Sequence, residues 1–179
     1  MLLATVDDIS IDEYMPKDLD SIFAYRSDPR INKFYSINPT TVDDLGEYLK
    51  RNIVKFNVSS GYSLFVIKKN KTIIGDVGIN CWGYQNKNCA IGYAINPEYQ
   101  RQGYAYSSLK AFINVLFVKY EKNRIQATLD PENEPSIKLL EKLKFTKEGY
   151  LREVDFDNGK WKDEILYALL NSEWINTNK

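Results

Sequence analysis

Residues 100–105, Gln-Arg-Gln-Gly-Tyr-Ala, have side chains that suit the binding of an anion. Gly103 and Ala105 are small, so a ligand can come close to the backbone there. If a helix begins at this point, its first N–H groups lack acceptors and its dipole favours a negative group. Arg101 adds a positive charge at the rim. The segment therefore predicts a phosphate or pyrophosphate site, although a glycine at a helix start is more often a simple turn or cap.

The flanking residues predict a strand before this segment and a helix after it. Residues 89–95 alternate between large side chains and alanine or glycine, which is the period of a strand. Pro97 ends that strand. Over residues 105–120 apolar side chains recur every three or four positions, which is typical of an amphipathic helix. A strand, a tight turn and a helix would hold the anion site in place.

The remaining pattern predicts one domain, residues 1–179, with a mixed sheet flanked by helices. The expected strands are residues 9–11, 62–68, 72–82, 88–96, 124–130, 145–155 and 161–170. The expected helices are residues 16–25, 42–56 and 103–121, with a further helix that starts at Asn133 or Ser136.

A short loop at residues 83–87 predicts how two strands pair. A loop centred on Gln85 gives three facing pairs: Cys81 with Cys89, Asn80 with Ala90, and Asp76 with Ala94. A slip of one residue would reverse the faces. In a reducing compartment the two cysteines are expected to be small buried residues rather than a disulfide.

Composition narrows the function classes. Lys and Arg together number 24, as do Asp and Glu, so no global positive field attracts nucleic acid. No uncharged apolar run approaches the ~20 residues of a membrane span, and the N-terminus lacks the basic start of a secretory signal. The absence of histidine excludes histidine bases and histidine metal clusters. We expect a cytoplasmic protein with no metal site and no nucleic-acid or membrane partner.

Several motifs in a fixed order resemble the GNAT superfamily of acyl-CoA N-acyltransferases. Gln100-x-x-Gly103-x-Ala105 is similar to that family's Q/R-x-x-G-x-G/A pyrophosphate turn. The motifs around it are Ile91-Gly92-Tyr93, Asp130-Pro131-Glu132-Asn133-Glu134-Pro135-Ser136, Leu143-Lys144-Phe145 and Glu148-Gly149. The set looks like the branch of ribosomal-protein N-terminal alanine and serine acetyltransferases. It implies an α/β (α+β mixed) fold, in which a mostly antiparallel sheet of six to seven strands with splayed central strands is flanked by about four helices.

The resemblance also implies direct transfer of acetyl from acetyl-CoA to a primary amine. In that family the pantetheine arm lies between the strands expected here at residues 88–96 and 124–130, like an added strand. A backbone N–H near Tyr93 to Ile95 would stabilise the oxyanion. The residues implied for acetyl-CoA binding are Ile95, Gln100, Arg101, Gln102, Gly103, Tyr104, Ala105 and Asn133.

The reaction also needs a base and a proton donor. A free amine has a pKa of about 10, so it must lose a proton before attack. Many relatives in this branch have Glu before Ile-Gly-Tyr, but this chain has Ala90. Asp76 is the main remaining candidate and Glu98 a weaker one, although a structural carboxylate explains Asp76 better. Ser136 matches the family's N-x-x-S serine and could donate to the departing thiolate, while Ser136 and Asn133 also suit helix caps.

The acceptor pocket is expected at four residues: Phe34, Tyr35, Asn80 and Trp82. Packing of the first two onto the core explains them equally well. A protein N-terminal amine is slightly favoured as acceptor, and a polyamine, an amino sugar or an aminoglycoside remains open. A CoA-binding regulatory domain without catalysis is the alternative from another class, supported by Ala90. A homodimer through the edge of the C-terminal strands is a further expectation.

Overall fold

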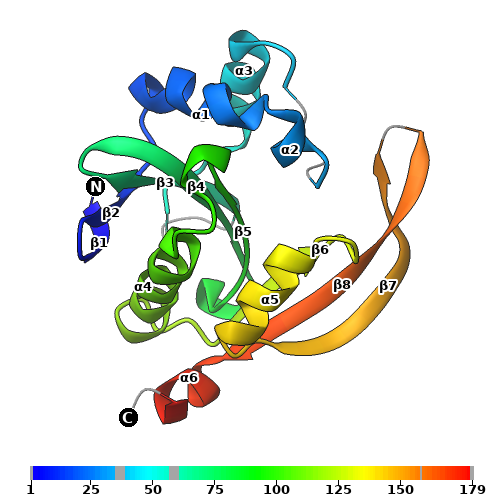
Figure 1. Cartoon of the computed structure of the whole chain (residues 1–179). Helices are drawn as coiled ribbons and strands as arrows, with labels where there is room; N and C mark the ends of the chain where they lie inside the picture. The colour runs from blue at the N-terminus through cyan, green and yellow to red at the C-terminus, as the bar shows by residue number, and fades with distance from the viewer. Residues whose placement is uncertain (1, 35–38, 57–60, 158, 178–179) are drawn as a thin grey trace.

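The computed structural model describes residues 2–34, 39–56, 61–157 and 159–177, and one eight-stranded sheet forms its centre (Figure 1). The strand order is β1-β2-β3-β4-β5-β6-β8-β7. The strands are β1 (Leu2–Val6), β2 (Ile9–Glu13), β3 (Gly61–Lys69), β4 (Thr72–Trp82), β5 (Asn88–Ile95), β6 (Arg124–Leu129), β7 (Thr146–Asp157) and β8 (Lys160–Leu170). The α-helices are α1 (Leu19–Arg26), α2 (Pro29–Asn32), α3 (Val42–Asn52), α4 (Tyr104–Val118), α5 (Glu134–Lys142) and α6 (Asn171–Thr177).

Helices cover both faces of the sheet with separate apolar clusters. On one face Phe112 of α4 and Leu140 of α5 belong to the main core cluster. On the other face Ile22 of α1 and Leu45 of α3 pack with Val66 of β3. Figure 1 shows α1, α2 and α3 together on one side of the sheet and α4 and α5 on the other. Because side chains alternate along a strand, the position of a residue decides which helix layer it meets.

The central strands β5 and β6 are parallel and pair over only a short length. Residues Asn88–Ala90 pair with Arg124–Gln126. The other neighbouring strands in the sheet pair in antiparallel fashion. Beyond these pairs the two strands diverge, and residues 91–95 and 127–129 line a cavity. The prediction of a mixed sheet with splayed central strands is confirmed.

The predicted register of the hairpin between β4 and β5 is also confirmed. The facing pairs are Cys81 with Cys89, Asn80 with Ala90, and Asp76 with Ala94. Both cysteines are buried and free. Every polar side chain assigned to a face of β4 by that register therefore lies on the expected face.

Four elements differ from the prediction. The sheet has eight strands rather than six or seven, because β1 was not expected, and the short helices α2 and α6 were also missed. Helix α3 ends at Asn52 instead of residue 56, since Ile53 has an extended backbone and forms a bridge with Tyr62. Among the described residues no helix is long and apolar enough to cross a membrane.

Candidate active site

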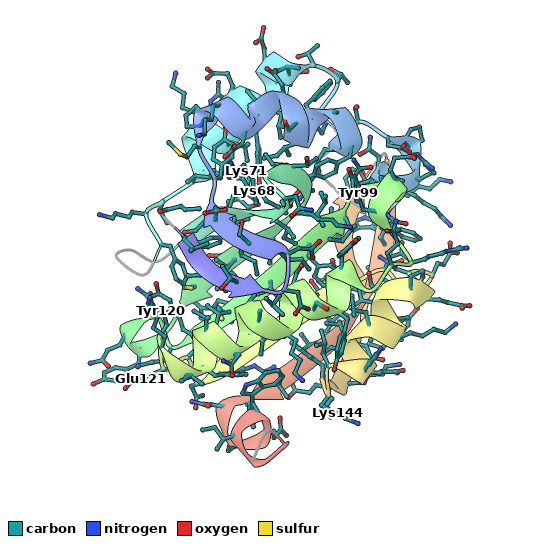
Figure 2. The ribbon with its side chains drawn as sticks, turned by 60° about the vertical axis from the view of Figure 1, so that its left-hand side comes forward. Lys68, Lys71, Tyr99, Tyr120, Glu121 and Lys144 are labelled. Carbon is teal, nitrogen blue, oxygen red and sulfur yellow. The ribbon has the colours of Figure 1, made fainter. Side chains whose placement is uncertain are left out.

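The predicted anion turn lies at the N-terminus of α4 and is open. Gly103 has a φ of 88°, which glycine adopts without strain. A Cβ at this position would meet no described atom within 4 Å. The Ser107 N–H donates to the Gly103 carbonyl (3.1 Å), so the N–H groups of residues 104–106 have no acceptor within the helix. These groups form an array of donors that can bind an anion, at the helix end near Tyr99 in Figure 2, opposite Tyr120.

The two glutamines of the turn hold its backbone in shape. The Gln100 Nε2 donates to the Ile95 carbonyl (2.9 Å), and the Gln102 Nε2 donates to the Glu98 carbonyl (3.1 Å). Of the two, Gln100 lines the cavity beside the turn, whereas Gln102 does not. Their side-chain amides thus position the turn, and the backbone N–H groups are left for a ligand.

A cavity of about 520 Å³ extends from the turn to the divergence of β5 and β6. Within the described part of the chain, its charged lining residues are all cationic: Arg30, Arg101, Lys138 and Lys142. Such a lining attracts a polyphosphate. The open glycine, the helix end and these cations together fit acetyl-CoA with its diphosphate at the turn.

Tyr93 on β5 and Ser136 on α5 meet at this cavity. Burial raises the pKa of Tyr93 to about 12, and a side-chain hydrogen bond with Ser136 acts in the opposite direction. Tyr93 is therefore protonated at neutral pH. The Asn133 Oδ1 accepts a bond from the Ser136 N–H (3.3 Å) and caps α5. Because Asn133 and Ser136 also line the cavity, capping is compatible with ligand contact.

Tyr104 is fixed at the edge of the turn. Its hydroxyl accepts a bond from Lys69 Nζ, which lies 4.6 Å from the centre of the Tyr104 ring. The ring centre of Tyr99 is 6.4 Å from that of Tyr104. Tyr104, Ala105 and Ile95 all line the cavity, and their part in acetyl-CoA binding, implied by the resemblance, stays a prediction.

Of the three predicted acceptor residues that the structure describes, one lies at the cavity. Phe34 lines it, and Tyr35 lies outside the described residues. Asn80 and Trp82 are exposed and do not line it. The reason is their place in the sheet: they pair with the first residues of β5, where β5 is still joined to β6. The cavity begins beyond that joined end.

Asp76, predicted as the main candidate base, is fully buried between α1 and β4. Its Oδ2 accepts bonds from Arg26 Nε (3.0 Å) and from the Tyr25 hydroxyl (2.5 Å), and its Oδ1 pairs with Arg26 Nη2. Asp76 lines neither cavity described here. Glu98, the weaker candidate, is exposed and lies 3.6 Å from the Arg30 guanidinium. Neither carboxylate lies in the cleft, and the contacts of Asp76 attach α1 to the sheet.

A second cavity, of about 60 Å³, adjoins the first. Phe34, Thr128 and Leu129 line both cavities. The charged residues of the second are Asp130, Asp155, Lys162, Asp163 and Glu164. Burial raises the pKa of Glu164, and a side-chain hydrogen bond with Thr128 partly opposes that change. Glu164 was not expected from the sequence, because the alternation along β8 does not reveal which face borders the cleft.

Comparison with known proteins agrees with this geometry. The family model of the acetyltransferase (GNAT) domain matches residues 9–146 of this chain. The chain therefore belongs to the GNAT family and is an N-acetyltransferase.

Two relatives and one solved structure show how similar this chain is to other acetyltransferases. An uncharacterized N-acetyltransferase, p20 of Bacillus licheniformis, is 31% identical over 160 residues, or 88% of this chain and 90% of that protein. The ribosomal protein uS5-alanine N-acetyltransferase of Escherichia coli is 35% identical over 86 residues, 48% of this chain and 44% of that protein. The structure of RimL, a ribosomal L7/L12 α-N-protein acetyltransferase in complex with coenzyme A, superimposes with a TM-score of 0.87 over 97% of this chain and 99% of that chain. At 16% identity this last likeness concerns the fold alone.

Proposed function

We propose that this N-acetyltransferase transfers acetyl from acetyl-CoA to the α-amine of a protein or peptide N-terminus. The observation that carries the proposal is a single cavity that joins the open turn at Gly103 to Tyr93 and Ser136 at the strand divergence. The partial match to an alanine N-acetyltransferase supports an N-terminal acceptor.

In this proposal the backbone binds most of the donor. The N–H groups of residues 104–106 hold the diphosphate, and Arg101, Lys138 and Lys142 neutralise its charge. Residues 91–95 pair with β4 but not with β6, so their backbone groups on the β6 side are available to a peptide-like arm. The donor supplies a thioester whose carbonyl carbon accepts the amine.

The chain then stabilises the charges that develop. A backbone N–H between Tyr93 and Ile95 donates to the oxyanion. Ser136 donates to the departing sulfur, and the raised pKa of Tyr93 keeps a proton beside Ser136. Asp76 acts as the anchor of α1 rather than as the base, because Arg26 and Tyr25 occupy its oxygens.

A free-thiol release assay tests this function. Acetyl-CoA would be supplied with hexapeptides that begin with alanine or serine, with spermidine, and with kanamycin. We expect the peptides to give the highest kcat/KM. Faster turnover of spermidine or kanamycin would move the assignment to a small-molecule acceptor. Binding of acetyl-CoA without thiol release on any probe would refute the proposed function in favour of a CoA-binding regulator.

The setting of the reaction is part of the same proposal. Free Cys81 and Cys89 suit a reducing cytoplasm. A homodimer would cover the edge strand β7, whose hairpin leaves Phe156 58% and Trp161 60% exposed. A monomeric mass in light scattering at micromolar concentration would reject the dimer.

A further inference from the structure

The proposed reaction lacks a base in the main cavity. The amine arrives mainly as an ammonium ion, because its pKa is about 10, and it must lose a proton before it can attack. None of the described residues that line the main cavity is Asp, Glu, Cys or His. A carboxylate from an adjoining surface would supply what is missing.

The face from which the amine arrives limits the choice. Helices α4 and α5 cover one face of the sheet near β5 and β6, so the acceptor must come from the face of α1 to α3. Ala127 and Leu129 belong to the cluster under α4 and α5, which places Thr128 on the acceptor face. Ile165 belongs to the same cluster, so Glu164 shares the face of Thr128.

The acceptor face also has room beside the divergence of the strands. Ala94 packs in the cluster of α1 and α3, which places Gly92 on the same face. Gly92 is exposed, and a Cβ built there would meet no described atom within 4 Å. Phe34 and Thr128 line both cavities, so the smaller cavity continues the route from this open space.

Glu164 is the carboxylate of this route with the features of a base. It contacts Thr128, which borders both cavities. Burial is the largest cause that raises its pKa, and the nearby carboxylates Asp155 and Asp130 act in the same direction. A carboxylate with a raised pKa holds a transferred proton more firmly, which makes it a stronger base.

Two other carboxylates of the small cavity accept hydrogen bonds from neighbouring protein groups. Asp163 accepts bonds from the Tyr150 hydroxyl (2.7 Å) and the Glu153 N–H (2.8 Å). The Asp130 Oδ1 accepts a bond from the Glu132 N–H (2.7 Å). These contacts shape the β7–β8 hairpin and the loop before α5. Of the two carboxylates that remain, Asp155 and Glu164, Glu164 is the better placed, because it contacts Thr128, which borders both cavities.

We propose that Glu164 binds the acceptor ammonium and removes its proton, acting as the general base of acetyl transfer. The inference rests on the proposed function. Glu164 takes one proton from the ammonium, and the freed nitrogen lone pair forms a bond to the thioester carbonyl carbon. The C–S bond then breaks and its electron pair leaves with sulfur. The second proton of the nitrogen passes to that sulfur, and Glu164 returns the first proton to solvent.

The test compares Glu164→Gln with a matched control, Glu153→Gln, an exposed glutamate on β7 outside both cavities. The probe is the amine that gives the fastest thiol release. The unmodified protein should gain kcat/KM as pH rises through the pKa of Glu164, since the deprotonated form is active. Glu164→Gln should lower kcat/KM about 100-fold and remove this acid limb. Glu153→Gln should leave both unchanged, and calorimetry should find the same acetyl-CoA affinity in both variants.

A conservative variant keeps the test decisive if the glutamine variant folds poorly. Glu164→Asp retains the carboxylate and should restore the acid limb at a reduced rate. Native rates and an intact acid limb in Glu164→Gln would overturn the inference, as would a loss confined to Asp155→Asn. An unmodified protein that turns over no probe would refute the proposed function itself, which is a different outcome from activity that is independent of Glu164.

Discussion

The two cavities that meet at Thr128 differ in charge and in the kind of group that builds them. The larger one is lined by cations and by the backbone of a turn at a helix end. The smaller one is lined by four carboxylates and Lys162, which pairs with Asp157. In the proposed reaction the donor side therefore depends on backbone geometry, whereas the acceptor side depends on side chains from strands far apart in the sequence. Substitutions should affect the two sides separately.

The largest effect is expected from Asp76→Asn, which tests whether Asp76 stabilises the fold on the acceptor side or takes part in the reaction. Asn in place of the fully buried Asp76 breaks its ion pair with Arg26 and weakens the bond it accepts from Tyr25, so the free energy of unfolding should fall by about 3 kcal/mol. Urea denaturation measures this, with exposed Asp43→Asn as the control. The folded variant should retain its kcat. A lost kcat at native stability would return Asp76 to the mechanism.

The next effect, from Ser136→Ala, probes chemistry on the donor side without loss of binding. The Asn133 Oδ1 bonds to the backbone N–H of residue 136, which alanine keeps, so α5 should remain capped. We expect kcat to fall about 10- to 100-fold, because a donor to the leaving sulfur is lost. Acetyl-CoA affinity measured by calorimetry should not change. Unchanged turnover would exclude Ser136 from the reaction.

The smallest effect is expected from Gly103→Val, which tests the backbone character of the donor side. Valine brings a side chain into the open space of the turn and strains its left-handed conformation, so acetyl-CoA affinity should fall about tenfold. Gly159→Val is a matched control, since Gly159 also has a positive φ (79°) and open space but lies in the β7–β8 hairpin. Equal affinities in the two variants would contradict the anion turn.

The sequence predicted the elements whose signals are local. Alternation in β5, the glycine turn and the period of α4 lie within one continuous stretch, and the structure has all three. The end of α3 was missed because Phe56 continues the apolar period, while Ile53 forms an isolated bridge with Tyr62 of β3. Such a pairing competes with helix propensity and leaves no local mark.

The acceptor side was predicted less well for a related reason. Asn80 and Trp82 share strand faces with the expected site, but distance along β5 from the divergence decides which residues reach the cleft. Glu164 lies at the smaller cavity beside the cleft because β8 pairs with β6, a contact between segments that the sequence does not place together. Motif similarity predicted the donor turn, whereas the carboxylate proposed as the base could be found only from the pairing of strands in three dimensions.

Three residue pairs join β5 to β6, so the sheet consists of two smaller sheets connected by a short stretch of parallel pairing. An extended donor arm that bonds to both strands past this stretch would lengthen it. The amide hydrogens of β5 and β6 in that region would then exchange with solvent more slowly, and the two parts of the sheet would move as one rigid body. The strands that border the acceptor site would thus become rigid only after the donor has bound, which favours binding of the donor before the acceptor.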